Sequence, residues 1–180
     1  MSYAELDEAS AALAARLVGD GVVKGDRVAL LAPNGIDWAV TAYAVLRVGA
    51  VLVPLSTLLR PPELLAQLRT AAVSHLVTVP AFRGRSYLDD LEAAAPGLVD
   101  AVDAGRRHAA APNLRRLWTI DGIPSGAAPS DLVRAMADRV RPADDLVVLF
   151  TSGTTGNPKG AIHSRGGGVR AVAAGLEARG

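Results

Sequence analysis

Ten consecutive residues, 151–160, read Thr-Ser-Gly-Thr-Thr-Gly-Asn-Pro-Lys-Gly and follow directly on the apolar run 146–150. They include four hydroxyl side chains, three glycines and one lysine. Glycines let the backbone turn so that several N–H groups point into one concavity, which suits an anion. The hydroxyls add donors, and Lys159 adds a positive charge on a flexible stem. The pattern therefore indicates a phosphate-binding loop at the end of a buried strand.

Two other interpretations of this stretch fit less well. A Walker A loop has a second glycine five residues after its first, followed by Lys and Ser or Thr. Here position 158 is proline, and Lys159 is followed by Gly160. A solvent-exposed hairpin turn rich in Gly, Thr and Asn is the plainer alternative. Such a turn needs roughly two to five residues of this kind, so a run of ten favours the phosphate loop.

The stretch 148–159 resembles the phosphate-binding signature of the acyl-adenylate-forming (AMP-binding) superfamily. That family comprises acyl- and aryl-CoA synthetases, the adenylation domains of nonribosomal peptide synthetases, and luciferases. Three upstream segments are also similar to the family pattern, in the same order. They are Ser-Tyr-Ala-Glu-Leu at 2–6, Gly-Asp-Arg-Val-Ala-Leu with a later Pro-Asn at 25–34, and Gly-Ala-Val-Leu-Val-Pro-Leu at 49–55.

The resemblance implies a two-step reaction, in which a carboxylate attacks the α-phosphate of MgATP and a thiol then takes the acyl group. The implied cofactors and substrates are ATP, magnesium, coenzyme A and a carboxylic acid such as a fatty or aromatic acid. The loop would bind the β- and γ-phosphates, with Lys159 as the catalytic counter-charge for the leaving pyrophosphate. The residues implied to bind the nucleotide phosphates are Thr151, Ser152, Gly153, Thr154, Thr155, Gly156 and Lys159.

Members of this family run several hundred residues further than this chain. We therefore expect residues 1–180 to form the first part of the large N-terminal AMP-binding domain, truncated after the phosphate loop. Such a piece would lack the acyl pocket and the magnesium ligands, would be inactive alone, and could need a complementary C-terminal chain. The alternatives are a non-catalytic remnant with weak nucleotide-phosphate binding, or a piece of a peptide-synthetase adenylation domain. A weak similarity of residues 82–87 to CoA ligases favours the CoA synthetase.

Helical and strand patterns alternate along the chain, which predicts an α/β fold with a largely parallel sheet covered by helices. The apolar strands are continuous rather than alternating, as in sheets covered on both faces. Residues 96–113 lack clear periodicity and are expected to form a surface excursion. We expect helices over 2–19, 36–48, 61–72, 87–94 and 130–140, and strands over 27–31, 51–53, 75–79, 116–120, 146–150 and 161–164. The first helix should begin with a capping box at Ser2 and Glu5, and the last with Ser130 as its cap. In the second helix, the side chains expected to point mostly inward are Trp38, Val40, Tyr43, Ala44 and Leu46.

A few further residues have two interpretations. His163 follows the loop and is either a substrate-cavity residue or, as we favour, a strand histidine satisfied by packing; the family often has a second histidine where this chain has Arg165. Glycines 166–168 are either a second phosphate contact at a helix start or a flexible connection. The other two histidines and the acidic pairs 89–90 and 144–145 are interpreted as structural, capping or surface residues.

The amino-acid composition favours one compact domain and argues against a disulfide-linked, nucleic-acid-binding or membrane-spanning protein. A chain of 180 residues that is 50% hydrophobic can bury the core of one compact domain. The absence of cysteine excludes disulfides and thiolate chemistry, and a net charge of +1 gives no electrostatic case for binding nucleic acid or an anionic membrane. The N-terminus is acidic, unlike a signal peptide, and the apolar stretch 38–55 is interrupted by Arg47 and too short to span a bilayer. We expect a cytoplasmic protein.

Overall fold

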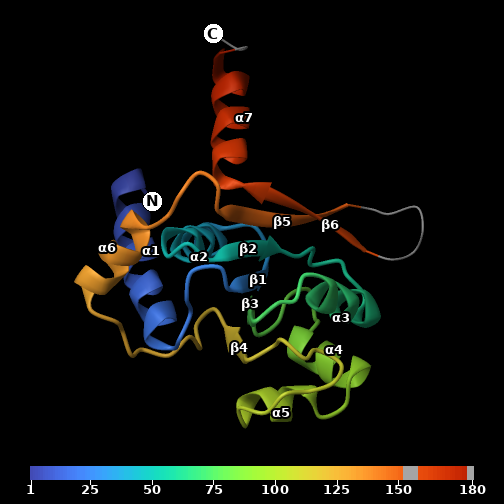
Figure 1. Ribbon diagram of the computed structural model, residues 1–180. Helices are drawn as coiled ribbons and strands as arrows, with labels where there is room; N and C mark the ends of the chain where they lie inside the picture. The colour runs from blue at the N-terminus through green and yellow to red at the C-terminus, as the bar shows by residue number, and fades with distance from the viewer. Residues whose placement is uncertain (152–157, 178–180) are drawn as a thin grey trace.

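The computed structural model describes residues 1–151 and 158–177, which form a sheet with helices on both faces (Figure 1). Within these residues the sheet has six strands in the order β4-β3-β1-β2-β5-β6. The first five strands along the chain pair in parallel, and β6 pairs antiparallel with β5. The strands are β1 (Arg27–Leu31), β2 (Val51–Pro54), β3 (His75–Thr78), β4 (Arg116–Thr119), β5 (Asp145–Thr151) and β6 (Lys159–Ser164). The predicted α/β class with a largely parallel sheet is confirmed.

Helices connect the strands and cover both faces of the sheet. In the part of the chain that the structure describes they are α1 (Tyr3–Gly19), α2 (Ile36–Arg47), α3 (Pro61–Thr70), α4 (Tyr87–Ala94), α5 (Leu98–Asp103), α6 (Ser130–Asp138) and α7 (Arg165–Glu177). The capping box predicted for the first helix is present: the Glu5 N–H donates to Ser2 Oγ at 3.2 Å, and the Ser2 N–H donates to Glu5 Oε2 at 2.6 Å.

The central strands are buried on both faces because successive side chains point into two separate cores. Ala29 and Leu31 of β1 belong to the core that includes α3, α4 and α5. Val28 and Leu30 belong to the core that includes α1, α2 and α6. All four side chains are fully buried, which explains why this strand is apolar at every position after Arg27.

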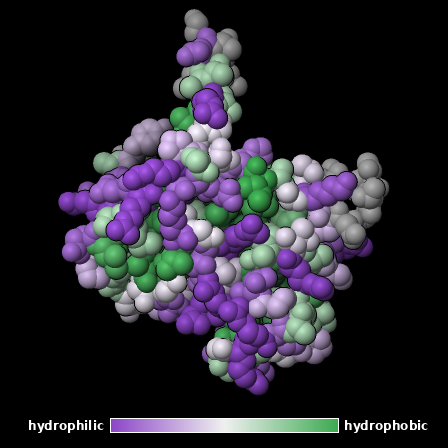
Figure 2. All heavy atoms as spheres, viewed as in Figure 1, coloured by the Kyte–Doolittle hydropathy of each residue, from purple (hydrophilic) through white to green (hydrophobic). Residues whose placement is uncertain are grey.

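The β5–β6 hairpin and α7 are covered far less than the rest. α7 projects from the body in Figure 1, and the space-filling view shows it as a narrow extension (Figure 2). Val148 of β5 is buried, but its neighbour Leu149 and its β6 partner Ile162 are exposed. The large exposed apolar side chains of this region are Leu149, Ile162, Val169 and Val172.

Three sequence-based expectations about local structure were wrong. Residues 96–113 contain α5, which buries Leu98, Ala101 and Val102. Tyr43 of α2 is 55% exposed rather than inward. Ser130 is the first helical residue of α6, and its neighbour Pro129 occupies the cap position. Of the two interpretations of glycines 166–168, the structure excludes the flexible connection, because these residues lie within α7.

Ala72 has a strained backbone conformation, which suggests a test of stability. α3 ends in a left-handed turn at Ala72, whose φ is 48°, and the Val73 N–H then donates to Leu68 O at 2.9 Å. This is the capping geometry that favours glycine. A left-handed conformation costs an L-residue about 1–2 kcal/mol, whereas the extra unfolded-state freedom of glycine costs about 0.4–1 kcal/mol.

We therefore expect Ala72→Gly to raise the free energy of unfolding by up to about 1 kcal/mol. Urea denaturation measures the change. The matched control is Ala66→Gly, inside α3, which should lower the free energy of unfolding by about 1 kcal/mol. A loss of stability in Ala72→Gly as large as that of Ala66→Gly would contradict this account.

His75 is a buried histidine at the start of β3 and was correctly interpreted as structural. Its Nδ1 lies 2.8 Å from Ser74 Oγ and 4.0 Å from the Asp26 carboxylate, and its ring stacks on Trp118 with 5.3 Å between centroids. Burial lowers the pKa of His75 from 6.5 to about 4, although the Asp26 carboxylate opposes the shift. The imidazole is therefore neutral in the folded protein at neutral pH.

This lowered pKa makes stability depend on pH. The unfolded chain takes up a proton at His75 near pH 6.5 and the folded chain only near pH 4, so stability is complete above pH 6.5 and is lost as the pH falls between those values. We expect urea unfolding to show a loss of up to about 2 kcal/mol between pH 7 and pH 5 from this group. In His75→Gln that part of the pH dependence should disappear. An identical pH dependence in both proteins would refute this role.

Candidate functional site

The predicted phosphate loop lies between the two strands of the β5–β6 hairpin. Thr151 is the last residue of β5, Lys159 is the first residue of β6, and the two face each other in the antiparallel register. Directly opposed residues point to the same face of a sheet, so the structure brings these two predicted site residues together. Ser152, Gly153, Thr154, Thr155 and Gly156 lie outside the described residues.

The β5 strand places this loop at the ligand-binding edge of the sheet. The five parallel strands all end at this edge, and ligands of open α/β sheets bind beyond the carboxyl ends of strands. Gly160 is closely packed at the base of the loop: a Cβ there would lie 2.8 Å from Val148 Cγ1. Close packing within the hairpin therefore favours glycine at position 160, in addition to any role of Gly160 in turning the chain.

The chain's two lysines have different surroundings. The ammonium of Lys24 lies 2.6 Å from Asp144 Oδ2 and donates to Arg139 O at 2.9 Å, and its hydrogen bond lowers the pKa of Asp144. Lys159 is exposed, and no carboxylate of residues 1–151 or 158–177 forms an ion pair with it. Its charge is therefore available for an anionic ligand, whereas Lys24 is a structural ion-pair partner.

His163 lies on β6, opposite Val147 and on the same face of the hairpin as Lys159. The side chain is exposed, so the favoured interpretation of a packed strand histidine was wrong. The acidic pairs have the structural roles expected of them: Asp90 pairs with Arg85 at 2.6 Å, and Asp144 accepts from the Arg141 N–H at 2.6 Å as well as from Lys24.

A cavity of about 510 Å³ opens at the same edge of the sheet, at the ends of β1 and β2. Its size lies within the range of about 300–1,000 Å³ typical of small-molecule sites. Apolar and aromatic side chains form much of its wall, and a few polar groups join them. The lining includes Trp38, Leu55, Phe82 and Arg83, with Asn34 and Thr57 as polar neighbours.

Arg83 is the cation of this cavity, and sequence reasoning did not select it as a site residue. A two-residue turn at 83–84 with positive φ angles presents its guanidinium, which lies 5.3 Å from the centroid of the Phe82 ring. Arg85 anchors the turn by donating to Leu59 O and to the Asp90 carboxylate. Because Arg85 is bound to protein and Arg83 is exposed, only Arg83 of the two is free to meet a ligand.

Within the described residues, no group of three or more His, Cys, Asp or Glu side chains could hold a metal ion. None of the helices in residues 1–151 and 158–177 is both long and apolar enough to cross a membrane.

The chain is similar to known proteins along most of its length. The sequence model of a family described as AMP-binding enzyme matches residues 1–179. The long-chain-fatty-acid–CoA ligase FadD13 of Mycobacterium tuberculosis is 32% identical over 169 residues, which cover 91% of this chain and 29% of that protein. The 4-coumarate–CoA ligase 5 of Oryza sativa subsp. japonica is 33% identical over 174 residues, which cover 96% of this chain and 29% of that protein.

Solved structures agree with these sequence matches. The inhibitor-bound N-terminal domain of FACL13 from Mycobacterium tuberculosis superposes with a TM-score of 0.64 and 28% identity, over 92% of this chain and 37% of that one. The chain thus spans 29% of the length of the curated relatives named above. The predicted family is confirmed, and the similarity is to the N-terminal portion of acyl-CoA ligases.

Proposed function

Because this chain belongs to the AMP-binding enzyme family, we propose that it is the front part of an ATP-dependent acid–thiol ligase of the acyl-CoA synthetase type. In this proposal residues 1–180 make up the first part of the large N-terminal domain, up to and including the phosphate loop. In the reaction a carboxylate oxygen attacks the α-phosphorus of ATP and the bond to the leaving pyrophosphate breaks. The thiol sulfur of coenzyme A then attacks the acyl carbon, and AMP leaves.

The observation that carries this proposal is the pairing of Thr151 with an exposed Lys159 at the carboxyl edge of the sheet. The hydroxyl of Thr151 donates to a phosphate oxygen, and the ammonium of Lys159 neutralises charge that grows on the leaving pyrophosphate. Ser152, Gly153, Thr154, Thr155 and Gly156 complete the loop in this proposal. Magnesium, when bound, would further neutralise the phosphates; we assign it no ligand in this chain.

The cavity at the carboxyl ends of β1 and β2 has room for part of a substrate. Its apolar wall suits an acyl or pantetheine chain, and Arg83 offers a cation to an anionic group. His163 shares the face of Lys159, so we place it near the adenylation chemistry rather than in the core. The choice of coenzyme A over a carrier protein as the thiol acceptor follows the named CoA ligases among the relatives.

A second candidate function is a non-catalytic piece that binds nucleotide phosphate weakly. Both faces of the hairpin expose a large apolar side chain, Leu149 on one and Ile162 on the other, and α7 exposes Val169 and Val172, which favours a chain that needs a complementary part. The same side chains lead us to expect that the chain alone associates or binds a hydrophobic dye.

The first expected outcome is that the isolated chain does not form an adenylate. It spans 29% of the length of FadD13, and one phosphate loop does not make an adenylation site. ATP–pyrophosphate exchange with magnesium and a panel of fatty and aromatic acids measures this directly. Exchange by the isolated chain clearly above that of its own Lys159→Ala variant would show that residues 1–180 suffice.

The second expected outcome concerns Lys159 in an active enzyme, made by joining this chain to the C-terminal part of an acyl-CoA ligase. Lys159→Ala should lower the single-turnover rate of adenylate formation about 10²–10³-fold, because the charge acts in the transition state. Binding of the carboxylic acid should change little. Lys159→Arg should restore the rate only in part, because a planar guanidinium does not replace a compact ammonium.

The matched control is Arg134→Ala, which removes an exposed cation from α6, away from the loop. Its rate should equal that of the parent enzyme. If Lys159→Ala retains a rate within about twofold of the parent, the loop is not the phosphate clamp proposed here.

A further inference from the structure

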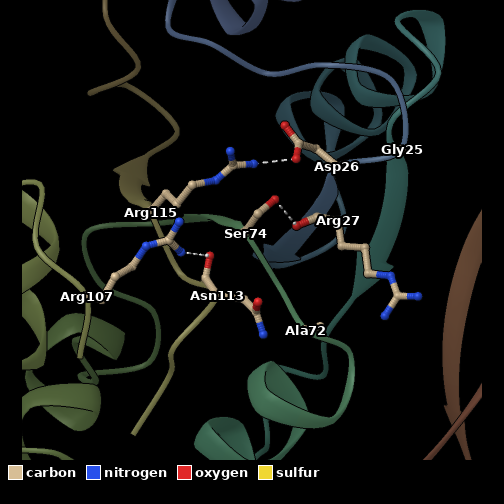
Figure 3. Close-up of a pocket in the computed structure, with 8 residues that line it drawn as sticks. All are labelled: Gly25, Asp26, Arg27, Ala72, Ser74, Arg107, Asn113 and Arg115. Atoms are coloured by element: carbon tan, nitrogen blue, oxygen red, sulfur yellow. Dashed lines mark hydrogen bonds and ion pairs between the residues drawn. The ribbon is translucent and has the colours of Figure 1, made fainter. Parts of the chain in front are cut away.

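A second cavity lies at the amino ends of β1, β3 and β4, on the edge of the sheet opposite the phosphate loop. Its volume is about 260 Å³. Residues that directly precede or begin these strands form much of it, and the segment between α5 and β4 supplies the rest. The polar lining consists of Asp26, Arg27, Ser74, Arg107, Asn113 and Arg115 (Figure 3).

The lining carries more positive than negative charge, since it includes three guanidinium groups and one carboxylate. The carboxylate of Asp26 is already compensated, because it pairs with Arg115 and accepts from the Val23 N–H at 3.0 Å. Arg27 turns away from the other two arginines in Figure 3 and donates to Ala71 O at 2.8 Å, at the end of α3. Arg107 has no ion-pair partner in residues 1–151 or 158–177.

The two remaining guanidiniums keep donors for a ligand. Arg107 uses Nη1 alone, donating to Pro112 O and Asn113 O at 3.0 Å each. Arg115 uses Nη2 for Asp26. In the described part of the chain, the Nε and second terminal nitrogen of both side chains have no protein acceptor. The Ser74 hydroxyl, by contrast, is committed to Arg27 O and His75.

We propose that this cavity binds a compact phosphate-type anion between Arg107 and Arg115. The planar fork of a guanidinium matches the oxygens of a phosphate, and charge-assisted bonds of this kind are strong. The volume is below the roughly 300 Å³ at which sites for drug-sized ligands begin, so the ligand is inorganic phosphate, pyrophosphate or a small phosphomonoester. The site is separate from the loop, because it lies at the amino ends of β1, β3 and β4, whereas the loop follows the carboxyl end of β5 in the same sheet.

Isothermal titration calorimetry of the whole 180-residue chain with inorganic phosphate, pyrophosphate and acetate, at constant ionic strength, tests the proposal. The titrations are made in the Lys159→Ala background, so that failure of the proposed phosphate loop and failure of this site give different results. We expect saturable binding of phosphate or pyrophosphate in that background, and weaker binding of acetate. Arg107→Ala should weaken it about 10-fold, the effect of one charge-assisted bond.

Arg107→Gln is the second variant, since it removes the charge and keeps an N–H donor for the carbonyls at 112–113; the same weakening is expected. The matched control is Arg106→Ala, which removes the neighbouring exposed guanidinium that does not line the cavity, and it should bind within about twofold of the parent. The proposal is overturned by an absence of saturable binding, by acetate binding as tightly as phosphate, by unchanged affinity in both Arg107 variants, or by an equal loss in Arg106→Ala.

Discussion

Burial of β1, β2 and β3 on both faces is the constraint on which the rest of this structure depends. These strands carry apolar side chains at nearly every position because α1, α2 and α6 cover one face and α3, α4 and α5 cover the other. Because helices cover both faces of these strands, polar side chains that could bind a ligand are left mainly at the strand ends. The phosphate loop and the cavity at Arg83 lie at one end, and the arginine-lined cavity lies at the other.

The hairpin that carries the predicted loop shares fewer register positions with the central strands than those strands share with one another. β1 and β2 share four register positions, whereas β2 and β5 share the single position Leu52–Val147. Other contacts add to this pairing: Arg165 Nη2 donates to Ala50 O at 3.2 Å, and the Gly166 N–H donates to Pro142 O at 2.8 Å. The exposed Leu149 and Ile162 show that one part of the hairpin has no cover within the described residues.

The sequence predicted the strands and most helices because the strands are short apolar runs and the helices have apolar residues at helical spacing, and such patterns depend on neighbours in the chain. α5 was missed because it has six residues, with left-handed glycines at 97 and 105 on either side, too short to show a helical period. Tyr43 was misplaced because helical spacing does not say how wide the covered face is. Arg115 and Asp26 pair across 89 positions, and the local pattern around either residue carries no signal of that contact.

The phosphate loop could be proposed from local sequence alone, since its hydroxyls, glycines and lysine lie within ten consecutive residues. The sequence could not show that the chain's two lysines lie at opposite ends of β5. Lys24 binds Asp144, immediately before the strand begins, and Lys159 faces Thr151, where the strand ends. A compact ammonium suits both places, because at the first it donates to a carbonyl and a carboxylate at once, and at the second it remains exposed for a ligand. Each end of β5 thus has a lysine beside it, one paired with a carboxylate of the protein and one left exposed.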